Sequence, residues 1–258
     1  MKKILLIILV TFVLVGCTKP SETSKNPNKP IDTASKEAYL KAVNNIYQQT
    51  SIDMTMTMYM DVSGAGENDE TQSAQMEVKV KNNDNLEASE ASMVTSMGDI
   101  KLASYLKDGN VYVDFLGDKS VEPIQESDLQ AFDYDQLTEH IIVLDELLNK
   151  MEKSESGNHQ IYTLELNDPD EISTLLQNND SNLLDSFVTD DEIRIDRIFI
   201  EMTIDENDRM IRYDMELNAT QTEREESAIM KIELVVNAYG DDVVVDFPDL
   251  SEFKREED

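Results

Sequence analysis

SIDMTMTMYMDV, residues 51–62, alternates apolar and polar side chains over almost its whole length. Ile52, Val62 and the four methionines between them share one parity, while most side chains of the other parity are Asp or Thr. Because successive side chains of a β-strand point to opposite faces of a sheet, this run predicts a long strand with one apolar face. Such strands are typical of an antiparallel sheet with one covered face.

The same two-residue period returns elsewhere in the chain, usually next to turn signals. Asp108-Gly109-Asn110 and Asp205-Glu206-Asn207-Asp208 are the clearest of these turns. We expect further strands at residues 76–80, 97–106, 111–115, 162–166, 198–204, 211–217 and 228–238. A shift of parity between Ile195 and Ile198 predicts a bulge.

Helical patterns lie before and between these strands. An amphipathic helix is expected from about Ser35 to Gln48. A second helix is predicted from a stripe of apolar residues that recur at spacings of four and three along one face. Asp168-Pro169-Asp170-Glu171 has the cap, proline and acids that start a third. Since an apolar sheet face must be buried, we predict an α+β fold: a strongly curved antiparallel half-barrel sheet covered on its concave face by helices. The stripe consists of Leu137, Ile141, Leu144, Leu148 and Met151.

The N-terminus has the features of a secretory signal. Lys2-Lys3 precede an apolar stretch from Ile4 to Val15, which Gly16-Cys17 follow. The stretch is shorter than the roughly 20 apolar residues that span a membrane, and a small residue stands before the expected cut. The cysteine after it resembles the bacterial lipobox. We therefore predict cleavage before Cys17 and attachment of a diacylglyceryl group to its thiol.

Three segments follow from these patterns. Residues 1–16 are predicted to be the signal peptide, residues 17–34 a lipidated and flexible tether, and residues 35–258 a single domain with an acidic tail. Cys17 is the one cysteine of the chain, so the domain must be held by its core without disulfides. The predicted location is the extracytoplasmic face of the cell membrane, held by acyl chains on Cys17.

The chain is strongly acidic, with a formal net charge of −32. Removing residues 1–16 removes two lysines and no acid, which makes the charge −34. This charge argues against nucleic acid, which needs a basic footprint, and against docking on anionic lipid through basic residues. The acidity either serves solubility or binds divalent cations weakly and collectively.

Motifs for catalysis are missing from the sequence. Glu139-His140 lacks the second histidine of a zinc H-E-x-x-H helix, His159 follows a glycine-containing turn, and Cys17 is taken up by its predicted lipid. Neither a G-x-S-x-G elbow nor a phosphate loop occurs. A carboxylate pair for glycoside hydrolysis stays open, although an absence of Trp is unfavourable for sugar stacking. We predict no enzyme, no cofactor and no metal site.

Methionines gather on the apolar parity of the predicted strands. Thioethers bind Cu(I), but same-face side chains of one strand lie about 6.6–6.8 Å apart and no cysteine or histidine pair accompanies them, so a core role is favoured. Methionine is also adaptable and lines surfaces that accept variable apolar partners. Ordinary packing therefore competes with a deformable ligand cavity. The residues predicted to line this cavity are Met54, Met56, Met58, Met60, Met202 and Met215.

Two acidic turns carry oxygen atoms that are suitable for calcium. They are Asp205-Glu206-Asn207-Asp208 and Asn178-Asn179-Asp180. Neither turn has the ligand spacing, the glycine and the final glutamate of an EF-hand. Solvated turns are therefore the favoured interpretation of both.

A lipobox, a tether with prolines, an N-terminal helix and meandering strands around a helical middle resemble the LolA/LppX-like lipoproteins, over roughly residues 35–250. The segment YLKDGNVYV, residues 105–113, is similar to a hairpin motif of uncharacterised Gram-positive members. The resemblance implies a half-barrel that helices close around an apolar cavity, in which characterised members carry lipids or lipid-linked molecules. It brings no catalytic motif. Being lipidated itself, the chain departs from the members that shuttle lipoproteins.

Two functions are compatible with these features. The first is a membrane-anchored lipoprotein that binds a hydrophobic, lipid-like ligand in the half-barrel cavity. The alternative is a non-enzymatic protein-interaction or sensory module of the cell envelope. Its cavity would be filled by its own side chains, and its acidic face would bind a protein partner of unknown identity.

Overall fold

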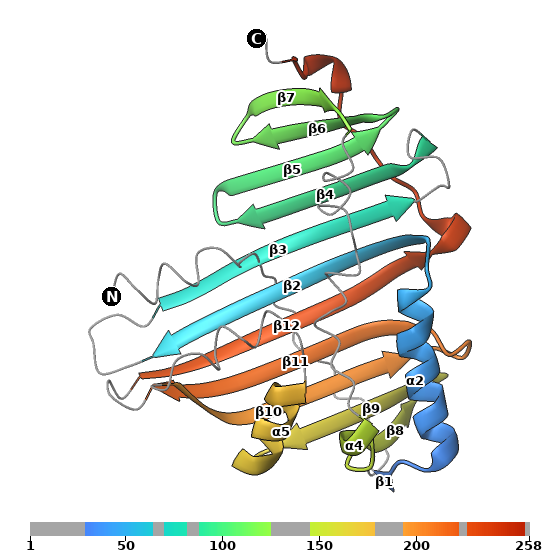
Figure 1. Ribbon diagram of the computed structural model, residues 1–258, viewed down its shortest axis with the longest axis vertical. Coiled ribbons are helices and arrows are strands. Elements are labelled where there is room, and N and C mark those ends of the chain that lie inside the picture. Colours follow the sequence, from blue (N-terminus) through green and yellow to red (C-terminus); the bar gives the residue numbers. More distant parts are fainter. Residues whose placement is uncertain are drawn as a thin grey trace.

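A computed structural model describes residues 29–63, 70–81, 88–124, 145–178, 193–221 and 226–255. Within these ranges the dominant feature is one 12-stranded antiparallel sheet, in the order β1-β8-β9-β10-β11-β12-β2-β3-β4-β5-β6-β7 (Figure 1). The strands are β1 (Lys29–Pro30), β2 (Ser51–Ser63), β3 (Glu70–Lys81), β4 (Glu90–Met97), β5 (Ile100–Lys107), β6 (Asn110–Phe115), β7 (Asp118–Pro123), β8 (Glu152–Ser156), β9 (His159–Leu166), β10 (Ile193–Ile204), β11 (Met210–Gln221) and β12 (Glu226–Tyr239).

The sheet consists of two runs of neighbouring strands. Strands β2 to β7 lie side by side in their sequence order, and so do β8 to β12. The two runs meet where β12 pairs with β2, from Ser227 opposite Ser63 to Tyr239 opposite Ile52. The pairing of β12 with β2, between segments far apart in the sequence, therefore joins the two runs.

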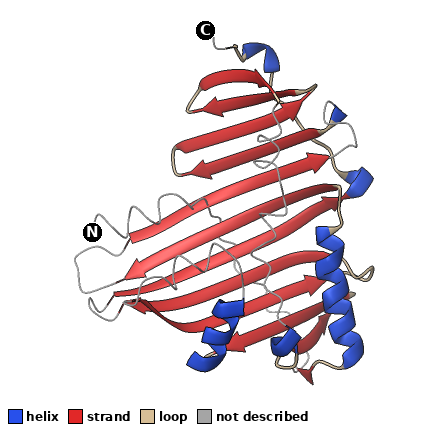
Figure 2. Cartoon of the chain, viewed as in Figure 1, coloured by secondary structure: helices blue, strands red, loops and turns tan. Residues whose placement is uncertain are grey.

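Helices lie against one part of this sheet (Figure 2). In the part of the chain that the structure describes, they are α2 (Thr33–Tyr47), α4 (Asp145–Leu148) and α5 (Pro169–Asn178), with two short 3-10 helices, η3 (Gly240–Asp242) and η4 (Leu250–Glu252). Asp32 caps α2, because its carboxylate accepts a 2.8 Å hydrogen bond from the backbone N–H of Ser35. None of these helices has the length and apolar character needed to cross a bilayer.

The strand predicted at residues 97–106 is wrong in its limits, because a turn at Gly98-Asp99 divides that region into β4 and β5. Met97 and Ile100 are cross-strand partners on the same face, although one number is odd and the other even. The apolar parity therefore changes across Gly98-Asp99, and this change was the sign of a hairpin. Strands β7 and β8 are short and largely polar, and their sequences carry no apolar alternation.

Several local predictions are confirmed. The register of β10 against β11 shifts between Ile195 and Arg197, where the change of parity predicted a bulge. Helix α5 begins at Pro169, and the Asp168 carboxylate accepts a hydrogen bond of 2.9 Å from the N–H of Asp170. A large, curled antiparallel sheet with few helices in the described ranges agrees with the predicted fold class.

The folded part begins before the expected boundary at residue 35. Lys29 and Pro30 pair with β8, and the N–H of Ile31 donates to the carbonyl of Met151 at 3.2 Å. Cys17 and the predicted signal peptide, residues 1–16, lie outside the described residues. So do His140, Asn179-Asp180 and most of the predicted helical stripe, of which Leu148 and Met151 are described and buried.

The C-terminal segment packs against the sheet instead of forming only an acidic tail. Phe253 is buried, with its ring centroid 6.2 Å from that of Tyr105 and 5.5 Å from that of Tyr112. The N–H of Val121 donates to the carbonyl of Lys254 at 3.0 Å, next to a bridge between Ser120 and Lys254. The segment therefore pairs with the outer edge of β7.

Candidate functional site: an apolar sheet face

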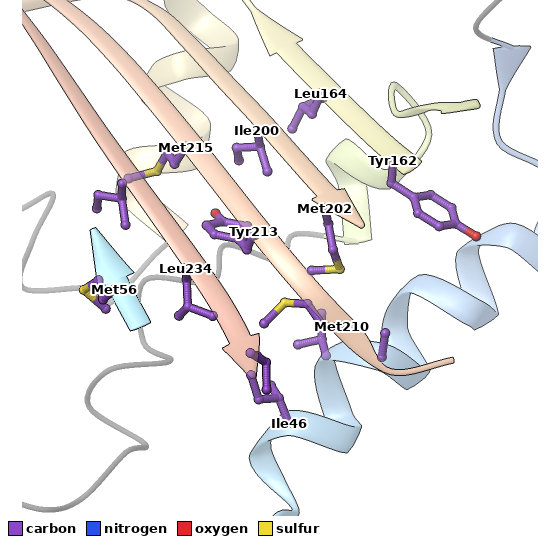
Figure 3. Close-up of a cluster of buried hydrophobic side chains, with 14 of the residues drawn as sticks. Ile46, Met56, Tyr162, Leu164, Ile200, Met202, Met210, Tyr213, Met215 and Leu234 are labelled. Atoms are coloured by element: carbon purple, nitrogen blue, oxygen red, sulfur yellow. The ribbon is translucent and has the colours of Figure 1, made fainter. Parts of the chain in front are cut away.

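The predicted methionine site lies on one face of the sheet, which we call the apolar face. Its side chains stand at alternate positions of neighbouring strands, and the register aligns them in rows (Figure 3). One row contains Tyr162, Met202, Tyr213, Leu234, Met56 and Met76. The next contains Leu164, Ile200, Met215, Ile232, Met58 and Ala74.

The structure brings all six predicted cavity residues to this face and buries every one. Met54, Met56, Met58 and Met60 expose between 0% and 5% of their surface, and Met202 and Met215 expose 0% and 2%. That they line a ligand cavity stays a prediction. Sequence reasoning did not select six further methionines that belong to or pack against the same core: Met76, Met93, Met97, Met151, Met210 and Met230.

Helix α2 packs against the apolar face near β11, and its buried side chains belong to the same core as the strands. Tyr39 of α2 meets Tyr162 of β9 edge-to-face, with ring centroids 5.7 Å apart. Burial raises the pKa of Tyr162 to about 12, and its hydroxyl donates to Gln160 Oε1 at 2.8 Å. Ile46 lies beside Met210 at the other end of this contact (Figure 3). This part of the face is therefore closed core.

The apolar face continues onto β3 to β6, where Val78, Ala91 and Leu106 are still buried but other side chains of the face are only half covered. From Met56 the row extends through Met76, Thr95 and Leu102 to Phe115. Exposure rises along it, from 1% at Met56 to 37% at Leu102 and 52% at Phe115. We call the half-buried methionines of this region, Met76, Met93 and Met97, the methionine strip. It offers an adaptable apolar surface that solvent reaches.

The opposite face of β9 to β12 carries charged side chains in ion pairs. Arg197 bonds Glu165 at 2.7 Å and Glu216 at 2.6 Å. Burial raises the pKa of Asp214, although the Arg212 guanidinium lies 2.7 Å from its carboxylate. Across the described ranges, no cluster of three or more His, Cys, Asp or Glu side chains is placed to hold a metal. The two faces thus differ sharply in chemistry.

The Asp205–Asp208 turn is organised by an arginine. Asp205 Oδ1 accepts hydrogen bonds from the N–H groups of Asn207 and Arg209, and the Arg209 side chain donates to Oδ2 at 2.9 Å. The Arg209 guanidinium thus forms an ion pair with the Asp205 carboxylate, at 2.8 Å. Partial burial acts to raise the pKa of Asp205, but the hydrogen bonds from Arg209 and Asn207 outweigh it and lower that pKa.

We predict a pH-dependent loss of stability from this turn. Because the folded-state pKa of Asp205 lies below the ordinary value of 3.8, its contribution is complete above that pH and is lost as the pH falls through the folded-state pKa. Asp205→Asn should have a lower thermal midpoint than the wild type at pH 6. The difference between the two midpoints should become smaller as the pH falls towards 2. Melting curves across this range check the prediction. A constant gap at every pH would contradict it.

No protein-family model matches the chain, and no curated protein matches it significantly. Similar solved structures include LprF from Mycobacterium bovis, with 9% identity and a TM-score of 0.44 over 85% of this chain and 99% of that one. A LolA superfamily protein from Nitrosomonas europaea has 10% identity and a TM-score of 0.22, over 80% of this chain and 94% of that one. A putative outer membrane lipoprotein-sorting protein domain from Vibrio parahaemolyticus has 9% identity and a TM-score of 0.22, over 81% and 95% of the two chains.

These names agree with the LolA/LppX-like resemblance found in the sequence, whereas the Gram-positive branch stays a prediction. All three TM-scores lie below 0.5. A functional assignment must therefore rest on the residues of this chain.

Proposed function

We propose that this chain is an extracytoplasmic lipoprotein, anchored through Cys17, that binds a hydrophobic, lipid-like ligand on the apolar face of its sheet, with helices closing the concave side. One observation carries the proposal. The apolar face does not end where the core ends, but continues through the methionine strip to exposed side chains on β5 and β6. Side chains that are only half covered stabilise the fold less than fully buried ones, so a row of them next to the core suits a ligand surface.

The chemistry of the face favours an acyl chain over a polar ligand. The row from Met56 to Phe115 contains Thr95 as its one polar member and no charged group. An acyl chain on this surface would gain roughly 0.8 kcal/mol for each buried CH₂ group. Flexible methionines accept chains of different length and saturation. We propose binding without catalysis.

A second function is favoured by a different observation. All six predicted cavity residues are at most 5% exposed, as in a core filled by its own side chains. In that case the chain is an interaction or sensory module of the cell envelope. The charged face of β9 to β12 would then be the surface that meets a protein partner.

Native mass spectrometry of the chain purified from its own membrane separates the two functions. We expect bound lipid masses on the wild type, and the mass of the chain itself reports the diacylglyceryl group at Cys17. Met93→Gln should lower lipid occupancy roughly five- to tenfold, because a polar amide replaces about 1 kcal/mol of apolar contact. Met93 is half buried, so this variant should keep its fold.

Val244→Gln provides the matched control, since Val244 is an exposed hydrophobic residue of the segment that follows β12. Its lipid occupancy should equal that of the wild type. A ligand-free wild type, or equal occupancy in Met93→Gln and Val244→Gln, would contradict binding at the methionine strip and favour the interaction module.

A further inference from the structure

Two hairpin turns lie next to each other at one rim of the sheet, where β4 turns into β5 and β6 turns into β7 (Figure 1). Four large apolar side chains gather there and form what we call the apolar tip. Leu102 and Phe115 are cross-strand partners, and the N–H of Leu116 donates to the carbonyl of Lys101 at 3.3 Å. The members are Ile100, Leu102, Phe115 and Leu116, which are 45%, 37%, 52% and 61% exposed.

The β6–β7 turn of the tip has a leucine in a backbone conformation that leucine disfavours. Leu116 and Gly117 have φ angles of +56° and +91°, and Asp108 and Gly109, in the turn between β5 and β6 at the opposite end of these strands, have +50° and +70°. Positive φ at both positions is the type I′ hairpin geometry, which favours Asn, Asp or Gly at the first position. Asp108 follows this preference. A leucine at the corresponding position costs stability, and it is the most exposed member of the tip.

The side chains of the tip suit a bilayer better than a protein partner. Isoleucine, leucine and phenylalanine partition favourably into a membrane, whereas protein hot spots are enriched in Trp, Tyr and Arg, which the tip lacks. The charge nearby is small for a chain of net charge −32. Two lysines, Lys101 and Lys119, offset part of the charge of Asp99, Asp114, Asp118 and Glu252, and Lys119 pairs with Glu252 and Asp114. Repulsion from an anionic bilayer is therefore weaker here than elsewhere on the chain.

We propose that the apolar tip is a second membrane contact, which inserts into the bilayer interface and places the open end of the apolar face against the lipid. This rests on the proposed anchoring through Cys17. The tether from Cys17 to Lys29 reaches at most about 40 Å, similar to the length of the longest strand, β12, at about 3.3 Å per residue. The rim that carries the tip can thus reach the bilayer that holds the anchor.

The chain contains no tryptophan, so a single introduced indole reports on one position alone. The full lipidated chain carrying Phe115→Trp is reconstituted in vesicles of phosphatidylethanolamine and phosphatidylglycerol, a fraction of which carry brominated acyl chains. We expect a blue-shifted emission that loses intensity as the brominated fraction rises. Val244→Trp is the matched control, and its emission should be neither shifted nor quenched.

A second variant separates docking from folding. Adding Leu116→Asn to Phe115→Trp gives the turn the residue that it favours, so the thermal midpoint should stay equal or rise while the quenching is lost. Equal quenching with and without Leu116→Asn would overturn the part of the proposal that concerns Leu116.

The remaining outcomes also decide between the proposals. If the Phe115→Trp chain sediments with the vesicles but its emission is not quenched, the anchoring through Cys17 stands and the proposed insertion of the tip is wrong. If the chain purified from its membrane has no lipid on Cys17 and the Phe115→Trp emission is still quenched, the proposed membrane contact of the tip stands and the proposed anchor is wrong. The Trp emission could instead shift to the blue without vesicles, and more so at higher protein concentration. In that case a second copy of the chain covers the tip, and the proposed bilayer contact is wrong.

Discussion

Met56→Asp is expected to unfold the domain. Met56 is 1% exposed in the middle of the sheet, with Leu234 and Met76 as its cross-strand partners. A carboxylate at this position finds no partner on the apolar face, and burying it costs about 4 kcal/mol or more. Since a domain has about 5–15 kcal/mol of total stability, this cost is a large part of it and exceeds what a domain at the lower end can lose and stay folded at working temperature. Circular dichroism melting and urea unfolding measure the effect.

Two variants show whether charge at this position is the cause. Met56→Leu keeps the volume and the apolar character, and it should cost less than about 1.5 kcal/mol. Ser73→Asp adds the same charge on the opposite face of the neighbouring strand β3, where an effect within about 0.5 kcal/mol is expected. A Met56→Asp chain that melts like the wild type would show that water reaches Met56.

The second large effect is expected from Phe253→Ala. The Phe253 ring is 7% exposed and packs against Tyr105 and Tyr112, so its removal should cost about 3 kcal/mol of local stability. The loss should release the C-terminal segment and leave the edge of β7 without its pairing to Lys254. Hydrogen exchange should become faster in β6 and β7, and a protease should cut after residue 247 more readily.

Phe115→Ala is the matched control for this change. Phe115 lies on β6 of the same sheet, but it is half exposed, so its truncation should leave hydrogen exchange in β7 almost unchanged. Equal exchange rates in the two variants would contradict the role that we assign to Phe253.

The strands with strong alternation were predictable because their signal is local. The run at residues 51–62 predicts its own two faces, and the structure places Met54, Met56, Met58 and Met60 on one of them. The bulge near Ile195 and the start of α5 at Pro169 also depend on neighbours in the sequence. These features need no knowledge of the partner strand.

The difference between closed core and half-covered strip was not predictable in the same way. Met56 and Met76 belong to similar alternating runs, yet Met76 is half buried and Met56 is fully buried. Their exposure depends on the order of the strands and on the position of α2 against β11, which follow from pairings between distant segments. The Leu116-Gly117 turn was missed because its first residue is one that type I′ turns disfavour.

The pairing of β12 with β2 has a consequence for how the chain acquires its structure. Hairpins within each run close short loops and form early, whereas this seam joins segments that lie more than 150 residues apart, such as Ser63 and Ser227. β12 is the last strand of the sheet along the chain, so the edges of β11 and β2 that it joins stay unpaired until the whole chain is present where it folds. Association of these edges between incompletely folded chains competes with folding, and the slowest kinetic phase should report the pairing of β12 with β2.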